Sequence, residues 1–154
     1  MLMVEENKEL LAILKDIFEE LKWISKRDLT DLDNEAIGAV TLGVGESKMI
    51  YERKNMTGEI MFAGISSAST DVTVRVIVDA YTPVELLTIA SLLTAGATEP
   101  NNMLWAKSPG GGVYALYSNF PLAFEWRIQL EVVNKSATSS VTILGANVSA
   151  RIRR

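Results

Sequence analysis

Four carboxylates of this chain are spaced so that they could act on a glycosidic bond. Asp71 and Asp79 stand at the two ends of one predicted strand, and Glu125 and Glu131 lie on another. Most glycosidases use two carboxyl groups that flank the scissile bond, and carboxylates on adjacent strands could form such a pair. All four fall on polar strand faces, however, where arginines of the same strands offer cross-strand ion pairs. We therefore expect surface charges here and no catalytic pair.

The chain lacks the residues on which most other site chemistry depends. It contains no cysteine and no histidine. Disulfides and thiolate metal sites are thereby excluded, and so are the commonest general base and every Ser-His or Cys-His arrangement. Asp28, Asp31, Asp33 and Glu35 lack the spacing and the central glycine of a calcium-binding EF-hand loop. We predict a protein that is not an enzyme and has no cofactor and no metal site.

A second candidate chemistry is the recognition of a sugar or another ligand by loop residues. The candidate contact residues are Trp105, Gly110, Gly111, Gly112, Tyr114 and Tyr117. The glycine run lacks the lysine and hydroxyl of a P-loop, so it is interpreted as a flexible connection or a contact tip. The aromatic side chains could stack on a sugar or pack in a core or an interface. Strand alternation assigns Trp126 to the core.

Residues 5–26 are predicted to form a helix, because they are good helix formers without Gly or Pro. Apolar residues recur at alternating spacings of four and three, which is the a/d pattern of helices that wind around one another. The seam consists of Met3, Asn7, Leu10, Leu14, Ile17, Leu21 and Ile24, and all but Met3 are the predicted oligomerisation residues. Leucine at a with isoleucine at d favours trimers or larger bundles over dimers. The polar Asn7 would fix the register.

The apolar face of this helix is wider than a strict seam. Leu11 and Phe18 occupy e positions and Ile13 occupies a g position. A face of this width could instead pack on the β domain of the same chain. The seam and the flanking stripe together could also serve both contacts. The polar, acidic residues 26–36 are interpreted as a linker, so the predicted division is 1–36 for helix and linker and 37–154 for a β domain.

The second part of the chain is predicted to be an antiparallel β-sandwich of the jelly-roll type. Seven or eight short runs alternate between apolar and polar residues, with turn residues between them and no βαβ rhythm. Val72–Val78 and Phe124–Val132 are predicted strands, and Gly145 a bulge in the last strand. A capping box at Thr82 predicts one inserted helix that ends at Gly96.

Roughly residues 58–150 contain three features: a strand ending in Asp, a Pro-x-x-Phe entry to a long strand and a Val-x-Asn-x-Ser hairpin. The runs that carry them are Gly58–Phe62 with Ser66–Ser67, Val72–Asp79, Tyr114–Tyr117, Phe120–Phe124 and Leu130–Ser136. Together they resemble the β-sandwich structural proteins of phages and archaeal viruses. The resemblance implies a non-enzymatic virion component such as a capsid, fibre or tail element.

Charge and hydropathy limit which partners and which cellular location can be expected. Residues 1–35 carry ten acids and five bases, a net of −5, and residues 36–154 carry nine acids and ten bases, a net of +1. Overall acidity argues against nucleic-acid binding. Neither a signal peptide nor an apolar run that spans a bilayer is predicted. We expect a homo-oligomer in a virion, or in the cytoplasm before assembly, with other virion proteins as further partners. The scarcity of glutamine and the absence of cysteine hint at a thermophilic source.

Overall fold

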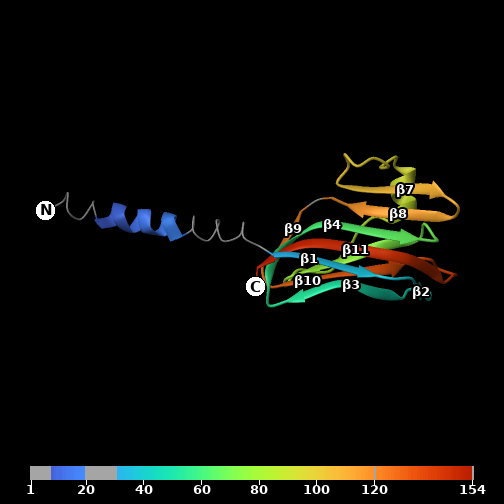
Figure 1. Ribbon diagram of the computed structural model, residues 1–154, viewed down its shortest axis with the longest axis horizontal. Helices are drawn as coiled ribbons and strands as arrows, with labels where there is room; N and C mark the ends of the chain where they lie inside the picture. Colours follow the sequence, from blue (N-terminus) through green and yellow to red (C-terminus); the bar gives the residue numbers. More distant parts are fainter. Residues whose placement is uncertain (1–7, 20–30, 120, 154) are drawn as a thin grey trace.

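The computed structural model describes residues 8–19, 31–119 and 121–153. The β domain consists of two antiparallel sheets that pack face to face (Figure 1). The larger sheet has the strand order β1-β11-β4-β8-β7, with β2 paired to β11 and β9 paired to β4. The smaller sheet has the order β3-β10-β5-β6. The predicted antiparallel β-sandwich is thus confirmed.

The strands of both sheets are mostly short. Those of the larger sheet are β1 (Asp31–Ile37), β2 (Val40–Leu42), β4 (Thr57–Ser67), β7 (Leu104–Gly110), β8 (Val113–Ser118), β9 (Leu122–Phe124) and β11 (Val141–Arg153). Those of the smaller sheet are β3 (Ser47–Lys54), β5 (Val72–Val78), β6 (Val84–Glu85) and β10 (Arg127–Asn134). The long β11 is the centre of its sheet, because it pairs with β1, β2 and β4. The predicted irregularity at Gly145 is present as a shift in the β11–β4 register.

The core fills the space between the sheets and follows the predicted alternation. Val72, Val74 and Val76 of β5 and Ile128, Leu130 and Val132 of β10 are buried. On the facing sheet, Ile143, Val148, Ala150 and Ile152 of β11 are buried as well. Two faces of alternating residues that meet in this way are the standard core of a sandwich.

The acidic segment that was interpreted as a linker is a strand, and the linker interpretation was wrong for residues 31–36. β1 pairs with the end of β11 along its whole length, from Asp31 opposite Ile152 to Ile37 opposite Ala146. The carboxylates of Asp33 and Glu35 both contact the guanidinium group of Arg53 in β3, at 2.7 and 2.9 Å. Arg53 of the opposite sheet offsets part of the negative charge of this acidic edge strand.

The inserted helix begins later than predicted. α2 spans Ile89–Thr94, and its N-cap is Thr88, whose hydroxyl accepts a hydrogen bond from the Ser91 amide at 3.1 Å. The segment after Thr82 forms β6 instead, because Val84 and Glu85 pair with β5. The helix ends as predicted, since Gly96 follows it with a φ of +73°.

The predicted strand Phe124–Val132 is two strands in different sheets, and the assignment of Trp126 to the core was wrong. Phe124 ends β9 in the larger sheet, and Arg127 begins β10 in the smaller sheet. Trp126 lies in the crossing between them and is 45% exposed. The crossing is held by Asp79, whose carboxylate accepts hydrogen bonds from the amides of Glu125, Trp126 and Arg127 at 2.9–3.1 Å.

Candidate functional site

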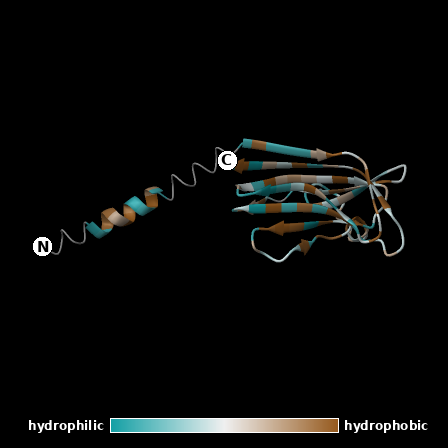
Figure 2. Cartoon of the chain, turned by 90° about the horizontal axis from the view of Figure 1, so that it is seen from below, coloured by the Kyte–Doolittle hydropathy of each residue, from teal (hydrophilic) through white to brown (hydrophobic). Residues whose placement is uncertain are grey.

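The N-terminal helix presents an unpacked apolar face. Residues 8–19 are helical, which confirms the central part of the predicted helix, and Asn7, Leu21 and Ile24 lie outside the described residues. Six large apolar side chains of the helix are 43–65% exposed: Leu10, Leu11, Ile13, Leu14, Ile17 and Phe18. Figure 2 shows apolar and polar stretches side by side on this helix. Most helical stability in proteins comes from packing of the apolar face, so this helix calls for a partner surface.

Five of the six side chains form a seam and a stripe beside it, and Ile13 at g borders the seam on its other side. Leu10, Leu14 and Ile17 occupy d, a and d of the heptad pattern, and Leu11 and Phe18 follow at e. The other face carries Lys8, Glu9, Ala12, Lys15, Asp16 and Glu19. A helix with one apolar and one charged face is suited to lie between an apolar surface and water.

On one side, the sandwich is sealed between β1 and β3. The Tyr51 hydroxyl donates a hydrogen bond to Asp33 at 2.8 Å, and the Arg53 guanidinium lies over the Tyr51 ring at 4.5 Å. Arg53 also donates to both oxygens of Asp33. Burial first, and the bond to Asp33 second, raise the pKa of the Tyr51 hydroxyl. This side is therefore closed by a neutral phenol and paired charges.

On the other side, the sandwich is only partly closed. α2 covers one half, where Ile89 and Leu92 are buried and the helix contacts β7 and β5. In the other half the edges are the very short β6 and β9, and between them lies an open groove of about 440 Å³. Its lining consists of Val76, Val78, Tyr81, Thr82, Val84, Leu86, Leu122 and Ala123. We call this the lateral groove.

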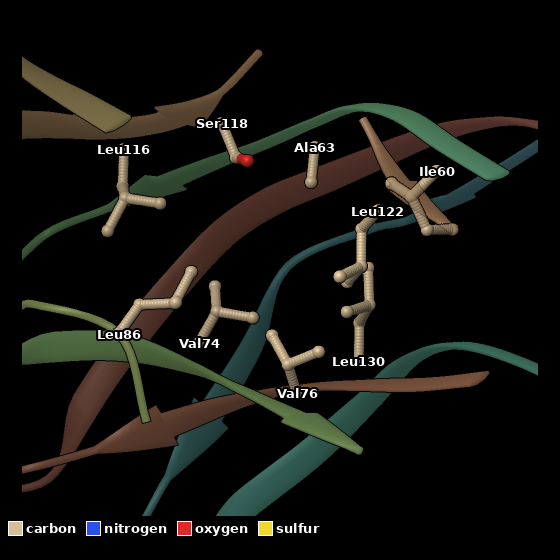
Figure 3. A pocket seen from close by; sticks show the side chains of 9 residues that line it. All are labelled: Ile60, Ala63, Val74, Val76, Leu86, Leu116, Ser118, Leu122 and Leu130. Carbon is tan, nitrogen blue, oxygen red and sulfur yellow. The ribbon is translucent and has the colours of Figure 1, made fainter. Parts of the chain in front are cut away.

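The lateral groove continues in two directions. Inward, Val76, Leu86 and Leu122 also line a narrow void of about 20 Å³ within the core, where side chains of both sheets point toward each other (Figure 3). Outward, Val78, Tyr81 and Ala123 also line a second hollow of about 360 Å³. That hollow is bounded by Asp79, Glu125 and Trp126. The groove is therefore apolar inside and acidic at one end.

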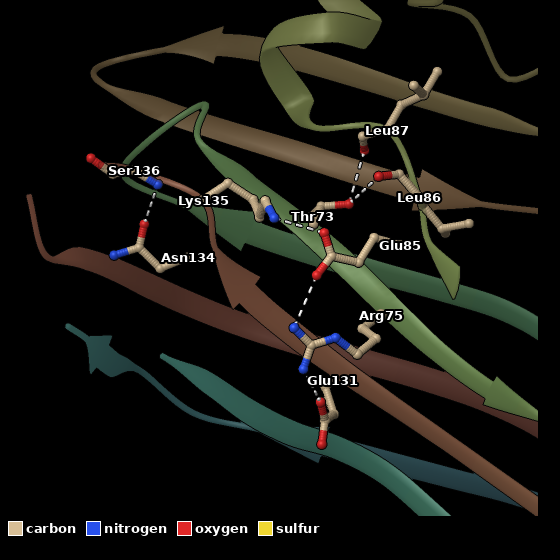
Figure 4. A network of polar contacts seen from close by, with 9 residues as sticks. All are labelled: Thr73, Arg75, Glu85, Leu86, Leu87, Glu131, Asn134, Lys135 and Ser136. Carbon is tan, nitrogen blue, oxygen red and sulfur yellow. Dashed lines mark hydrogen bonds and ion pairs between the residues drawn. The ribbon is translucent and has the colours of Figure 1, made fainter. Parts of the chain in front are cut away.

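A polar network holds the β6 wall of the groove in place (Figure 4). Arg75 contacts Glu85 at 2.9 Å and Glu131 at 3.1 Å, and Lys135 contacts Glu85 at 2.8 Å. The Thr73 hydroxyl donates to the Leu86 carbonyl at 2.6 Å. Lys135 first and Arg75 second lower the pKa of the Glu85 carboxyl. A strand of two residues is thus kept at the sheet edge by side chains on its polar face.

Two of the four carboxylates considered for hydrolysis, Asp79 and Glu131, have structural partners. Asp79 has a φ of +49°, and its two oxygens are occupied by backbone amides of the crossing. Burial works to raise the pKa of Asp79, but the amides of Trp126, Glu125 and Arg127 together lower it. Glu131 is paired with Arg75, and Asp71 lies at the opposite end of β5 from Asp79. Asp79 and Glu131 are thus engaged in structural contacts.

The structure divides the predicted loop contacts. Gly110, Gly111 and Gly112 form the tight end of the β7–β8 hairpin, each with positive φ. Trp105 and Tyr117 come together and stack at 4.2 Å, and Phe62 adds a third ring 6.1 Å from Tyr117. Tyr114 is separate, because it packs against the core.

The aromatic cluster of Trp105, Tyr117 and Phe62 does not offer an open stacking face. Trp105 is only 8% exposed, and the ammonium of Lys107 lies 5.3 Å from its ring. The cluster instead covers Gly64, where a Cβ would approach the Phe62 ring to 3.0 Å. Aromatic side chains that pack over a strand glycine stabilise the sheet. No observation on these residues favours sugar binding.

Sequence reasoning named the helix seam but missed the lateral groove. Val84 was assigned to the inserted helix and Trp126 to the core. A sequence signal existed, since residues 81–87 are mostly apolar and yet carry Pro83, which disfavours a central strand. Among the described residues, no group of three or more acidic side chains could hold a metal ion. In the same part of the chain, no helix has the length and hydropathy needed to cross a membrane.

Comparisons with known proteins add little. No protein-family model and no curated protein matches the chain. One similar solved structure is the serine protease of Aeromonas sobria, with a TM-score of 0.31 and 11% sequence identity. The alignment covers 82% of this chain and 28% of that chain, so this chain spans less than a third of the protease. A likeness of this degree supports no inference about activity.

Proposed function

We propose that this protein is a non-enzymatic structural subunit of a homo-oligomeric assembly whose copies join through the N-terminal helix. The observation that carries the proposal is the exposure of all six large apolar side chains of residues 8–19. Soluble monomers rarely expose a contiguous apolar surface of this kind, and such surfaces mark association sites. The heptad spacing supports a second copy of the same helix as the partner.

The proposed context is a viral particle, as a capsid, fibre or tail element. This step rests on the resemblance of the strand runs to virion proteins of phages and archaeal viruses. The architecture is compatible with it, because a sandwich with an appended helix can present one surface to copies of itself and another to neighbours. The occupied oxygens of Asp79 and the pairing of Glu131 favour a structural role over hydrolysis.

Two charges placed in the seam test the association. We expect the full chain to form a trimer or a larger oligomer, and the double variant Leu14→Glu, Ile17→Glu to be a monomer. Each glutamate would have to lose its hydration inside the bundle, which is strongly unfavourable. Light scattering coupled to size exclusion measures the molar mass of both proteins.

The matched control changes the opposite face of the same helix. Ala12 lies at f, among the charged residues, so Ala12→Glu introduces the same side chain outside the seam. It should leave the molar mass unchanged. A full-length chain that is monomeric at micromolar concentration would refute the proposed function.

A further inference from the structure

Three of the nine exposed large apolar side chains in the described part of the sandwich lie together at the lateral groove. Tyr81, Val84 and Trp126 are 75%, 57% and 45% exposed, and all three line the groove or the hollow that continues it. The other exposed large apolar residues of the sandwich are spread over separate elements: Leu32, Val44, Met61, Leu87, Met103 and Leu144. Apolar surface concentrated around a concave site marks a binding surface, whereas scattered single residues do not.

The helix has apolar side chains that a bundle seam does not use. Leu11 and Phe18 lie at e, one heptad apart, and are 65% and 63% exposed. Seven residues of helix are about 10 Å long, so the two side chains form a short stripe beside the seam. We call Leu11 and Phe18 the flanking stripe. Because the seam faces the other helices, this stripe needs a second apolar surface.

The charges beside the two surfaces are complementary. Lys8 and Lys15 lie three and four residues from Leu11, on the border of the flanking stripe. Asp79 and Glu125 stand at the outer end of the groove, and Glu125 is exposed. A helix that inserts Leu11 and Phe18 can therefore place its lysines toward the acidic end.

The hollow that continues the groove lies at the same end of the larger sheet as the start of β1. Asp31 pairs with Ile152, Ile152 with Gly58 and Gly58 with Phe124, so these four residues form one row across the larger sheet. Three strand spacings separate the first residue of β1 from Phe124, about 15 Å. The first residue of β1 therefore lies in the same row of the larger sheet as Phe124, which lines the hollow that continues the groove.

We infer that the lateral groove of one copy receives the flanking stripe of a helix from a second copy. The inference rests on the proposed function, since it requires an assembly. A second copy is the occupant because, within one chain, the stripe is exposed and the groove is open at the same time. The seam then sets the number of copies, and the groove fixes the orientation of each sandwich against its neighbour's helix.

The absence of cysteine makes a direct test simple. Two single-cysteine variants of the full chain, Phe18→Cys and Val84→Cys, are made separately, one of them with a mass tag. They are mixed, allowed to exchange subunits and oxidised gently. We expect a mixed disulfide between the two chains, resolved by its mass on a non-reducing gel. The control pair Ala12→Cys and Val84→Cys, with the thiol on the polar helix face, should give at least tenfold less.

Light scattering on the same samples separates the possible failures. An intact oligomer whose Phe18→Cys and Val84→Cys chains cross-link no better than the control pair overturns this inference and leaves the proposed function standing. A monomeric protein would contradict both this inference and the proposed function. The double variant Phe18→Cys, Val84→Cys covers the remaining case: a disulfide that forms within single chains, with none between tagged and untagged copies, means that each helix binds its own groove and overturns the inference.

Discussion

The two sides of the sandwich are closed by different means. Between β1 and β3, a tyrosine, an arginine and two carboxylates bond to one another across the sheets, and Tyr51 is fully buried. Between β6 and β9, the strands are two and three residues long, and a groove of about 440 Å³ remains. The open side is therefore not explained by a chain that is too short to close both sides of the sandwich. The same chain closes the other side with hydrogen bonds and ion pairs between the sheets.

The two sides should also respond differently to mutation. The closed side joins β1 of the larger sheet to β3 of the smaller sheet. Mutations there should therefore lower the stability of the whole sandwich. The open side consists of short elements at sheet edges, and regions of this kind open locally at a lower free energy than the core. Variants that change only the groove should therefore be available without unfolding the protein.

The largest effect is expected from Asp33→Ala on the closed side. The change leaves the half-buried Arg53 with one carboxylate and Tyr51 without its acceptor. Removing one partner of such a cluster costs about 3 kcal/mol of the free energy of unfolding. Urea denaturation followed by circular dichroism measures it, with an unchanged slope against denaturant.

The control for this variant is Asn34→Ala, at the next and exposed position of β1. It should change the free energy of unfolding by no more than about 0.5 kcal/mol. Equal losses in the two variants would mean that the cluster does not seal this side, and the contrast between the sides would fail.

A smaller effect is expected from Gly58→Ala on the open side. A Cβ at this position would lie 2.5 Å from the Arg151 carbonyl oxygen and 2.7 Å from the Phe124 ring. The Phe124 ring can turn aside, but the Arg151 carbonyl belongs to the backbone of β11, so β4 and β11 must also move apart at Gly58, at a cost of about 2 kcal/mol. We expect faster amide exchange in β9 and at the Gly58 end of the β4–β11 pairing, with β3 unaffected.

Gly38→Ala is the matched control, because a Cβ there meets nothing within 4 Å. It should leave the exchange rates of β9 unchanged. If Gly58→Ala speeds exchange uniformly across both sheets, the open side is not a separate unit.

The strands and the crossing between Phe124 and Arg127 differ in how far local sequence predicts them. β5 and β11 were predicted because alternation records one buried and one exposed face within a few residues. The break between Phe124 and Arg127 was not, because the run alternates without interruption. The turn is stabilised by Asp79, which lies 46 residues before Glu125 and accepts hydrogen bonds from its amides.

The groove was missed for the same physical reason. Thr82 and Glu85 carry a valid local signal for a helix start, but the pairing of Val84 and Glu85 with β5 overrides it. Arg75 and Lys135, which hold Glu85 at the sheet, come from β5 and from the residue after β10. The helix seam could be predicted because its spacing lies within one segment. The groove instead depends on four separate segments of the chain: β5, residues 81–86, β9 and Lys135.

The smallest effect is expected from Asp79→Ala, at the outer end of the groove. The carboxylate satisfies three amides at the crossing, and alanine also disfavours the positive φ of this position. We expect a loss of about 1.5 kcal/mol at neutral pH. Asp79→Asn, which keeps one oxygen and tolerates positive φ, should lose less. Asp71→Ala, at the exposed opposite end of β5, is the control and should lose almost nothing.

The pH dependence distinguishes the amide contacts of Asp79 from simple packing. The amides lower the pKa of the folded carboxyl below that of an unfolded aspartate. The contribution of Asp79 is therefore fully present above about pH 4, where the unfolded residue is ionised, and is lost as the pH falls through the lower folded pKa. The stability difference between the native chain and Asp79→Asn should shrink over that acidic window. A difference that stays constant down to pH 2 would assign the effect to side-chain shape, and the crossing would then owe nothing to the charge of Asp79.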